Sequence, residues 1–126
     1  MNTPNKERAL LLNVDDDPDI RALVTEALRD AGLTVASARD GNEALAEAAR
    51  MRPDVILLDK LMPGMDGTVF ASVYRAAGKG APIIAFCAAR DAEQWAAAIG
   101  AVSYIGKPFD VKELESLVLA QLPAIA

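Results

Sequence analysis

The stretch from Asp54 to Gly67 constrains the possible fold more than any other. Four apolar residues, Val55 to Leu58, lead directly into Asp59, and Pro63-Gly64 then breaks the chain. Such a run is typical of a strand that is buried on both faces and ends at an acid. Ligands of parallel α/β sheets bind outside the carboxyl ends of the strands, so Asp59 is a candidate for chemistry, although a turn aspartate after a strand is common.

Similar apolar runs alternate with amphipathic segments along the whole chain. They predict strands at about 9–14, 33–37, 54–58, 82–87 and 101–106, and helices at about 18–31, 42–51, 67–77 and 91–99, with a fifth helix after residue 110. Strict alternation indicates a parallel sheet with helices on both faces. We therefore predict an α/β fold, a flavodoxin-like doubly wound five-stranded parallel sheet in the order 2-1-3-4-5 with five helices. The second strand is polar, as an edge strand would be.

Several of the other aspartates have a structural explanation. Five of them precede or open a predicted helix and are expected to cap it: Asp17, Asp40, Asp66, Asp91 and Asp110. Glu113, three residues after Asp110, is expected to complete a capping box. Asp15 and Asp16 are not needed for this role.

Length and composition limit the class of protein. The 126 residues suffice for one domain, with an ordered core at about 9–122 and short tails at 1–8 and 123–126. The chain has no membrane-spanning run, no signal-peptide core and one cysteine, so we expect a cytoplasmic protein. A net charge of -5 argues against direct binding of nucleic acid. Without histidine, any metal would be bound mostly by oxygen, which favours Mg²⁺ or Ca²⁺.

The predicted strand order brings several polar residues to one crevice. The first and third strands are neighbours there, so Asp15, Asp16 and Asp59 lie together, with Cys87 and Lys107 on the flank. Three carboxylates cannot all be ionised in a partly buried pocket without a cation, and Mg²⁺ with a nearby lysine resolves the conflict. An aspartate in this setting can attack phosphorus and form an aspartyl phosphate.

Three motifs resemble those of response regulator receiver domains, the phosphoacceptor half of two-component signalling. They are Val14-Asp15-Asp16-Asp17-Pro18, then Pro53-Asp54 through Asp59 to Met62-Pro63-Gly64-Met65-Asp66-Gly67, and finally Gly100-Ala101 through Tyr104 to Lys107-Pro108-Phe109. Each motif alone is weak, whereas three in this order and spacing are specific. The resemblance runs from about Ala9 to Leu122, so one receiver domain is expected over residues 1–126.

The resemblance implies that Asp59 accepts a phosphoryl group from a phosphohistidine on a sensor histidine kinase or a histidine phosphotransfer protein. Lys107 would contact the phosphoryl group. Asp16, Asp59 and the backbone carbonyl of Leu61 would bind Mg²⁺ directly, and Asp15 would bind it through water.

Further implications concern the output. The domain would signal by protein contact through its fourth helix, fifth strand and fifth helix, as a monomer or weak homodimer, with no enzyme activity and no contact with DNA or membrane. Tyr104 matches the aromatic residue that turns inward on activation, although a half-buried strand tyrosine is the alternative. The peptide bond before Pro108 is expected to be cis, as in the family.

Cys87 is the main departure from the family, which usually has threonine or serine at this position. A thiol donates hydrogen bonds more weakly than a hydroxyl, so coupling between phosphate and switch should be looser; a buried cysteine can also pack simply as a small apolar residue. The interval from Cys87 to Lys107 is shorter than usual, which predicts a shortened fourth helix or leading loop. Trp95 is either an interface anchor or a core residue. Lys60 adds a positive charge whose role the sequence does not indicate.

Three other functions were compared with the phosphoacceptor. A receiver-like interaction module that works without phosphate is favoured by Cys87 but not by the intact acidic site. A magnesium-dependent phosphatase with an aspartyl nucleophile commonly has a second aspartate two residues later, where this chain has Leu61. Flavin binding is the poorest match, because the loop after the first strand is acidic where a phosphate cradle needs glycines and hydroxyls.

Overall fold

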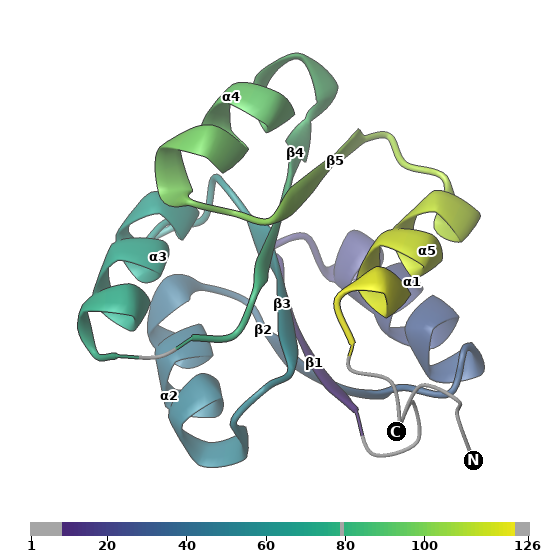
Figure 1. Ribbon diagram of the computed structural model, residues 1–126, viewed down its shortest axis with the longest axis horizontal. Helices are drawn as coiled ribbons and strands as arrows, with labels where there is room; N and C mark the ends of the chain where they lie inside the picture. Colours follow the sequence, from purple (N-terminus) through teal and green to yellow (C-terminus); the bar gives the residue numbers. More distant parts are fainter. Residues whose placement is uncertain (1–8, 79, 123–126) are drawn as a thin grey trace.

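The computed structural model describes residues 9–78 and 80–122, so the predicted tails at 1–8 and 123–126 lie outside the described residues. Five parallel strands form one sheet in the order β2-β1-β3-β4-β5 (Figure 1), which confirms the prediction. The strands are β1 (Leu10–Val14), β2 (Thr34–Ala38), β3 (Val55–Asp59), β4 (Ile83–Ala88) and β5 (Ser103–Lys107). β2 is an edge strand, as its polar sequence indicated.

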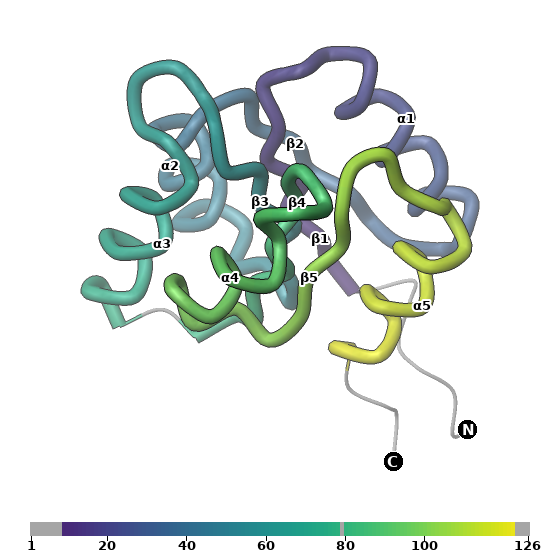
Figure 2. The backbone as a smooth tube through the Cα atoms, turned by 90° about the horizontal axis from the view of Figure 1, so that it is seen from above, coloured from purple at the N-terminus to yellow at the C-terminus, as the bar shows by residue number. Residues whose placement is uncertain are grey.

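Four helices connect consecutive strands, a fifth follows the last strand, and together they cover both faces of the sheet. They are α1 (Pro18–Asp30), α2 (Gly41–Met51), α3 (Gly67–Ala76), α4 (Ala89–Ile99) and α5 (Val111–Ala120). Figure 2 shows α1 and α5 on one side of the strands and α2, α3 and α4 on the other. The fold is therefore the predicted flavodoxin-like, doubly wound α/β fold. In the part of the chain that is described, no helix has the length and apolar character needed to cross a bilayer.

The central strands send alternate side chains into two separate cores. Leu12 of β1 and Leu58 of β3 pack on the side of α2, α3 and α4, whereas Leu11 and Leu57 pack on the side of α1 and α5. All five residues of β3 are buried, which explains why its sequence shows an unbroken apolar run instead of alternation. This double burial fixes the position of Asp59 at the end of the strand.

Aspartates begin four of the five helices. Side chains accept hydrogen bonds from free N–H groups of the first turn at Asp17, Asp40, Asp66 and Asp110, as predicted. Among these, Asp110 accepts from the N–H of Glu113 at 3.3 Å. Over residues 9–78 and 80–122 no bond returns from the Glu113 side chain, so only half of the predicted capping box forms.

The start of α4 differs from the prediction. Ala88, the last residue of β4, is the N-cap and makes no side-chain bond, so Asp91 lies inside the first turn and does not cap the helix. The reason lies in β5, where Gly106 is the register partner of Cys87. A Cβ on Gly106 would stand 2.6 Å from the Cα of Ala89, so the glycine lets the helix begin directly against the sheet. No loop residue therefore separates β4 from α4.

Candidate functional site

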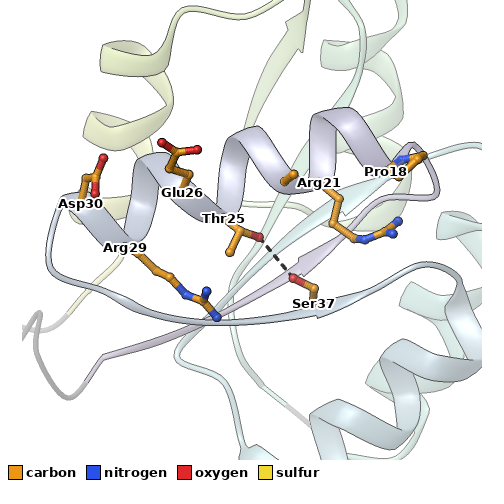
Figure 3. Close-up of a pocket in the computed structure, with 8 residues that line it drawn as sticks. Pro18, Arg21, Thr25, Glu26, Arg29, Asp30 and Ser37 are labelled. Carbon is orange, nitrogen blue, oxygen red and sulfur yellow. Dashed lines mark hydrogen bonds between the residues drawn. The ribbon is translucent and has the colours of Figure 1, made fainter.

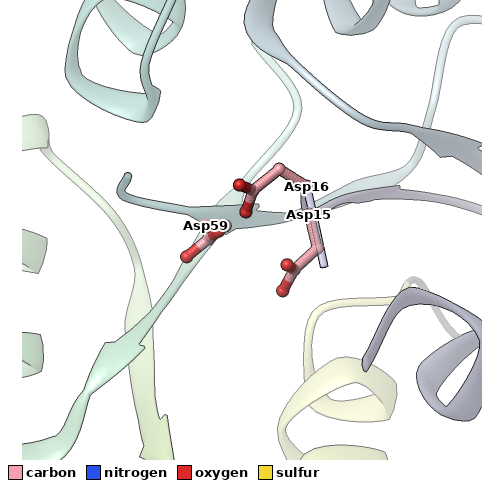
Figure 4. Close-up of side chains that lie close together, drawn as sticks. All are labelled: Asp15, Asp16 and Asp59. Atoms are coloured by element: carbon pink, nitrogen blue, oxygen red, sulfur yellow. The ribbon is translucent and has the colours of Figure 1, made fainter. Parts of the chain in front are cut away.

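Three carboxylates meet at the carboxyl ends of β1 and β3 (Figure 4). One oxygen from each of Asp15, Asp16 and Asp59 lies within 4.8 Å of the others. Val14 and Leu58 are register partners, so the residues that follow them reach the same edge of the sheet. Asp15 and Asp59 are buried and Asp16 is exposed. The structure therefore brings together the three acids that the sequence predicted would meet.

Backbone hydrogen bonds hold Asp15 in place. Its N–H donates to the carbonyl of Ala38 at 3.0 Å, and its Oδ1 accepts from the N–H of Asp17 at 2.9 Å. Its carbonyl accepts from Nη1 of Arg21 at 2.7 Å. The sequence analysis missed Arg21; its position on the first turn of α1, directly after the acids, is the signal that could have identified it.

Lys107 lies between two of the acids. Its Nζ is 2.9 Å from Oδ2 of Asp15 and 3.1 Å from Oδ1 of Asp59. The same ammonium group lies 4.6 Å from the centre of the Phe86 ring, within the range of a cation–π interaction. Lys107 is the last residue of β5, one position later than the predicted end of that strand, and the peptide bond to Pro108 is cis, as expected.

The electrostatics of the site follow from burial. Burial, together with the charge of Asp15, raises the pKa of Asp59 from the ordinary 3.8 to about 7, although Lys107 acts in the opposite direction. For Lys107, burial acts to lower the pKa, but the bonds and charges of Asp15 and Asp59 outweigh it and raise the pKa above 10.5. Three carboxylates and one ammonium group leave negative charge uncompensated.

The donor set fits a hard divalent cation. Carboxylate oxygens are the ligands that Mg²⁺ prefers, and one exposed carboxylate, Asp16, keeps the crevice open to solvent. Asp16 and Leu61 line the same shallow pocket of about 310 Å³, so the residue whose carbonyl was predicted as a ligand lies beside the cluster. A Mg²⁺ ion would also neutralise the uncompensated charge.

Comparisons with known proteins agree with this geometry. The response regulator receiver domain family matches residues 11–119. The DNA-binding response regulator MtrA of Mycolicibacterium smegmatis is 39% identical over 117 residues, which cover 91% of this chain and 51% of MtrA. The chain belongs to the response regulator receiver domains. It spans about half the length of the curated relative MtrA.

Two further matches show the same receiver domain alone and within a longer protein. The solved structure of the chemotaxis response regulator CheY4 of Vibrio cholerae has a TM-score of 0.81 and 37% identity, and the match covers 90% of this receiver and 98% of that chain. The DNA-binding transcriptional regulator NtrC of Salmonella typhimurium is 40% identical over 114 residues, which cover 89% of this receiver and 24% of NtrC. The predicted family is thus confirmed.

Cys87 of this receiver behaves as a small buried residue. It faces the core of α2, α3 and α4, and its Sγ makes a long contact of 3.7 Å to the carbonyl oxygen of Ala88. Burial raises the pKa of its thiol above the ordinary 9.0, although the charge of Lys60 acts in the opposite direction. The thiol is therefore protonated at neutral pH, which does not favour a redox role. Lys60 also donates its N–H to Oδ1 of Asp59 at 2.9 Å.

Tyr104 on β5 and Trp95 on α4 have opposite environments. Tyr104 is 43% exposed on β5, so its ring is not turned inward and fits the alternative of a half-buried strand tyrosine. Trp95 is buried on α4 and donates from Nε1 to Oγ1 of Thr68 at 2.9 Å, which decides for the core alternative. Its bond to Thr68 was not predicted from the sequence.

A larger groove of about 580 Å³ lies away from the acids, between α1 and β2 (Figure 3). Thr25 and Ser37 hydrogen-bond across it at 3.2 Å, and Arg29 donates to the carbonyl of Val35 at 3.2 Å. Among the described residues, the acidic group that could hold a metal ion is Asp15, Asp16 and Asp59, none of which lines this groove. We therefore assign the chemistry to the smaller acidic crevice.

Proposed function

We propose that this receiver is a phosphoacceptor in which Asp59 takes a phosphoryl group from a phosphohistidine, with Mg²⁺ as cofactor. The observation that carries the proposal is the convergence of Asp15, Asp16 and Asp59 around the ammonium group of Lys107. Membership of a two-component signalling family supports it. The donor would be a sensor histidine kinase or a histidine phosphotransfer protein.

Asp59 would act as the nucleophile. A carboxylate oxygen attacks phosphorus, the P–N bond breaks, and its electron pair returns to the imidazole nitrogen of the donor, which takes up a proton from water. This attack requires the ionised carboxylate, and a pKa of about 7 leaves a fraction of Asp59 protonated at neutral pH. Bound Mg²⁺ would favour ionisation and neutralise phosphoryl oxygens. Asp16, Asp59 and the Leu61 carbonyl would hold the ion directly and Asp15 through water.

Lys107 would be the second source of positive charge. Its ammonium group already bridges Asp15 and Asp59, so it can exchange one carboxylate partner for a phosphoryl oxygen with little movement of the backbone. The same bridge keeps the lysine side chain from extending into solvent when no phosphoryl group is present. Lys107 thus acts as a point charge that needs no bidentate geometry.

The output would be protein contact through α4, β5 and α5. Both MtrA and NtrC are DNA-binding regulators by name, but a net charge of -5 makes this receiver a poor DNA ligand by itself. The phosphoryl signal would therefore pass to another protein surface. Cys87 and Tyr104 occupy the positions of the family's switch residues, and the partner is to be sought beside them.

Intact-mass spectrometry after incubation with acetyl phosphate and Mg²⁺ tests the proposal. We expect the native chain to gain one phosphoryl group and Asp59→Asn to gain none, while Asp30→Asn, a control on the exposed last turn of α1, gains it normally. No gain in the native chain, with Mg²⁺ still bound, would favour the phosphate-independent interaction module.

The metal ligands need a separate measurement. Asp16→Ala should abolish Mg²⁺ binding in calorimetry, because it removes a direct ligand from a site that has few. Asp30→Ala, which removes an exposed acid of α1, should leave binding intact. Equal affinity in the two variants would contradict the ligand assignment without touching the identity of the nucleophile.

A further inference from the structure

Trp95, the chain's single tryptophan, joins α4 to α3. It is 5% exposed, and its Nε1–H donates to Oγ1 of Thr68 at 2.9 Å. Thr68 is the second residue of α3, so the bond reaches the first turn of the helix that follows the Asp59 loop. At the far end of the two helices, Nη2 of Arg75 donates to the carbonyl of Gly100 at 3.2 Å. α3 is therefore tied to α4 near both of its own ends.

The indole ring also lies against the backbone next to the phosphorylation site. A Cβ on Gly67 would stand 2.9 Å from Cη2 and Cζ2 of Trp95 and would overlap the backbone oxygen of Asp59. The N–H of Gly67 donates to the carbonyl of Lys60 at 2.9 Å. One glycine backbone thus separates the indole ring from the carbonyl of Asp59. Protein interiors are close-packed, so displacement on one side of this glycine is felt on the other.

The residues at the two positions that the family uses for switching make only weak contacts in this chain. Cys87 makes only a long thiol contact, and Tyr104 is 43% exposed. No loop residue separates β4 from α4, because Ala88 ends the strand and Ala89 begins the helix. A displacement of the β4 end toward a phosphoryl group would therefore act on α4 itself.

From these contacts we propose that Trp95 is a positioning residue that couples the Asp59 loop to the α3–α4 side of the domain through Gly67 and Thr68. The inference rests on the proposed function, since it needs a group on Asp59 to start the movement. It adds a second element to the output: α3 moves with α4, held by the indole bond, instead of staying fixed while α4 alone responds. Thr68 carries the polar part of the coupling and Gly67 the steric part.

Two-dimensional amide NMR with beryllium trifluoride and Mg²⁺ tests this coupling, because beryllium binds a carboxylate oxygen and its three fluorides take the place of phosphoryl oxygens. A single tryptophan gives a single indole N–H signal, so Trp95 reports on itself. We expect this signal and the amides of the first turn of α3 to shift in the native chain. In Thr68→Val, which keeps the side-chain shape and removes the acceptor, most of both shifts should be lost.

Tyr74→Phe is the matched control. It also removes one polar group from α3, the Tyr74 hydroxyl that accepts from the N–H of Ala81 at 3.3 Å, but lies far along the helix from Gly67. Its shifts should equal those of the native chain, and urea unfolding of both variants shows whether a general loss of stability could explain a difference. Fluorine NMR shows whether beryllium trifluoride is bound, which tests the proposed function separately from the coupling through Trp95.

Each outcome is decisive. A native chain that binds no beryllium trifluoride overturns the proposed function, and the coupling falls with it. If beryllium trifluoride binds but the indole signal does not move, or the shifts are equal in the native chain and Thr68→Val, the coupling alone is overturned. If beryllium trifluoride binds and the shifts are lost in Thr68→Val but kept in Tyr74→Phe, the coupling is supported.

Discussion

Different interactions hold two neighbouring regions at the carboxyl ends of the strands. At the ends of β1 and β3, the buried Asp15 and Asp59 are held by hydrogen bonds and by a shared ammonium group. At the end of β4 and along α4, Cys87 and Trp95 are held chiefly by packing, with one long thiol contact and one indole bond. Energies of the first kind depend on protonation, and those of the second kind depend on volume and shape.

This difference teaches that chemistry and transmission need not depart from a family together. The acids and the lysine converge as the resemblance implied, whereas Cys87, at the position proposed for the switch, is a buried thiol and no loop residue precedes α4. We therefore expect the acidic end to respond to pH and the α4 end to respond to changes in side-chain volume.

The largest expected effect is the pH dependence at the acidic end. The pKa of Asp59 is higher in the folded protein (about 7) than its ordinary 3.8, so the folded state binds this proton more tightly than the unfolded state. The contribution is fully present below pH 4 and is lost as pH rises through 7. Without metal, the stability of the native chain relative to Asp59→Asn should fall by on the order of 4 kcal/mol over this range.

Urea unfolding of both proteins in a chelator, from pH 4 to pH 8, checks this expectation. Asp30→Asn serves as the control, because it removes an exposed acid from α1 and should follow the native chain at every pH. Parallel curves for the native chain and Asp59→Asn would show that Asp59 ionises as easily in the folded state as in the unfolded state. The acidic end would then not be the pH-sensitive region of the comparison.

Gly67→Ala should produce the next largest effect, now at the α4 end. The added methyl group would overlap the carbonyl of Asp59 and press on the ring of Trp95, so the variant should lose roughly 2–3 kcal/mol of stability, as overpacked sites do. Gly80→Ala is the control, because a Cβ there meets nothing within 4 Å. Equal midpoints in chemical denaturation would mean that the α3–α4 contact yields easily to volume.

The fold was largely predictable because its signals are local. Apolar runs indicated β1, β3 and β4, shorter and more polar segments indicated β2 and β5, and aspartates at helix starts indicated four of the five N-caps. The start of α4 was wrong for a non-local reason: Asp91 offers a capping side chain, but Gly106 on β5 admits the helix two residues earlier. A prediction of the helix start from local propensity cannot take account of a glycine that lies fifteen positions away.

The candidate site was predictable as far as strand order carries it. Asp15, Asp16 and Asp59 follow from two strand ends that become neighbours, and Lys107 follows from the end of the fifth strand on the flank of the same crevice. The contact of Arg21 with the Asp15 carbonyl spans only six positions and was detectable, whereas that of Phe86 with Lys107 depends on side-chain packing across elements. A pairing of the latter kind has no short-range signature in the sequence, and the same holds for Trp95 and Thr68.

Cys87→Thr should have a modest effect on stability and a larger one on transmission. A hydroxyl in a site now filled by a thiol costs about 1 kcal/mol if it finds no good partner, but it can donate to a phosphoryl oxygen on Asp59 more strongly than the thiol does. We expect larger amide shifts on phosphorylation than in the native chain. Cys87→Val, of similar shape and without a donor, should not enlarge them. Unchanged spectra of the phosphorylated Cys87→Thr form would count against a loose switch.

Tyr104→Phe should have the smallest effect. The ring is 43% exposed, and within the described residues its hydroxyl makes no hydrogen bond, so its loss should change stability by less than about 0.5 kcal/mol. Tyr74→Phe, which loses a part-buried bond on α3, should cost about 1 kcal/mol and sets the scale. The indole signal of Trp95 gives the sharper measurement: if Tyr104→Phe suppressed its shift as Thr68→Val is expected to, transmission would run through β5 after all. An unaltered shift would leave packing around α4 as the region that carries the signal, and the exposed tyrosine as surface available to a partner.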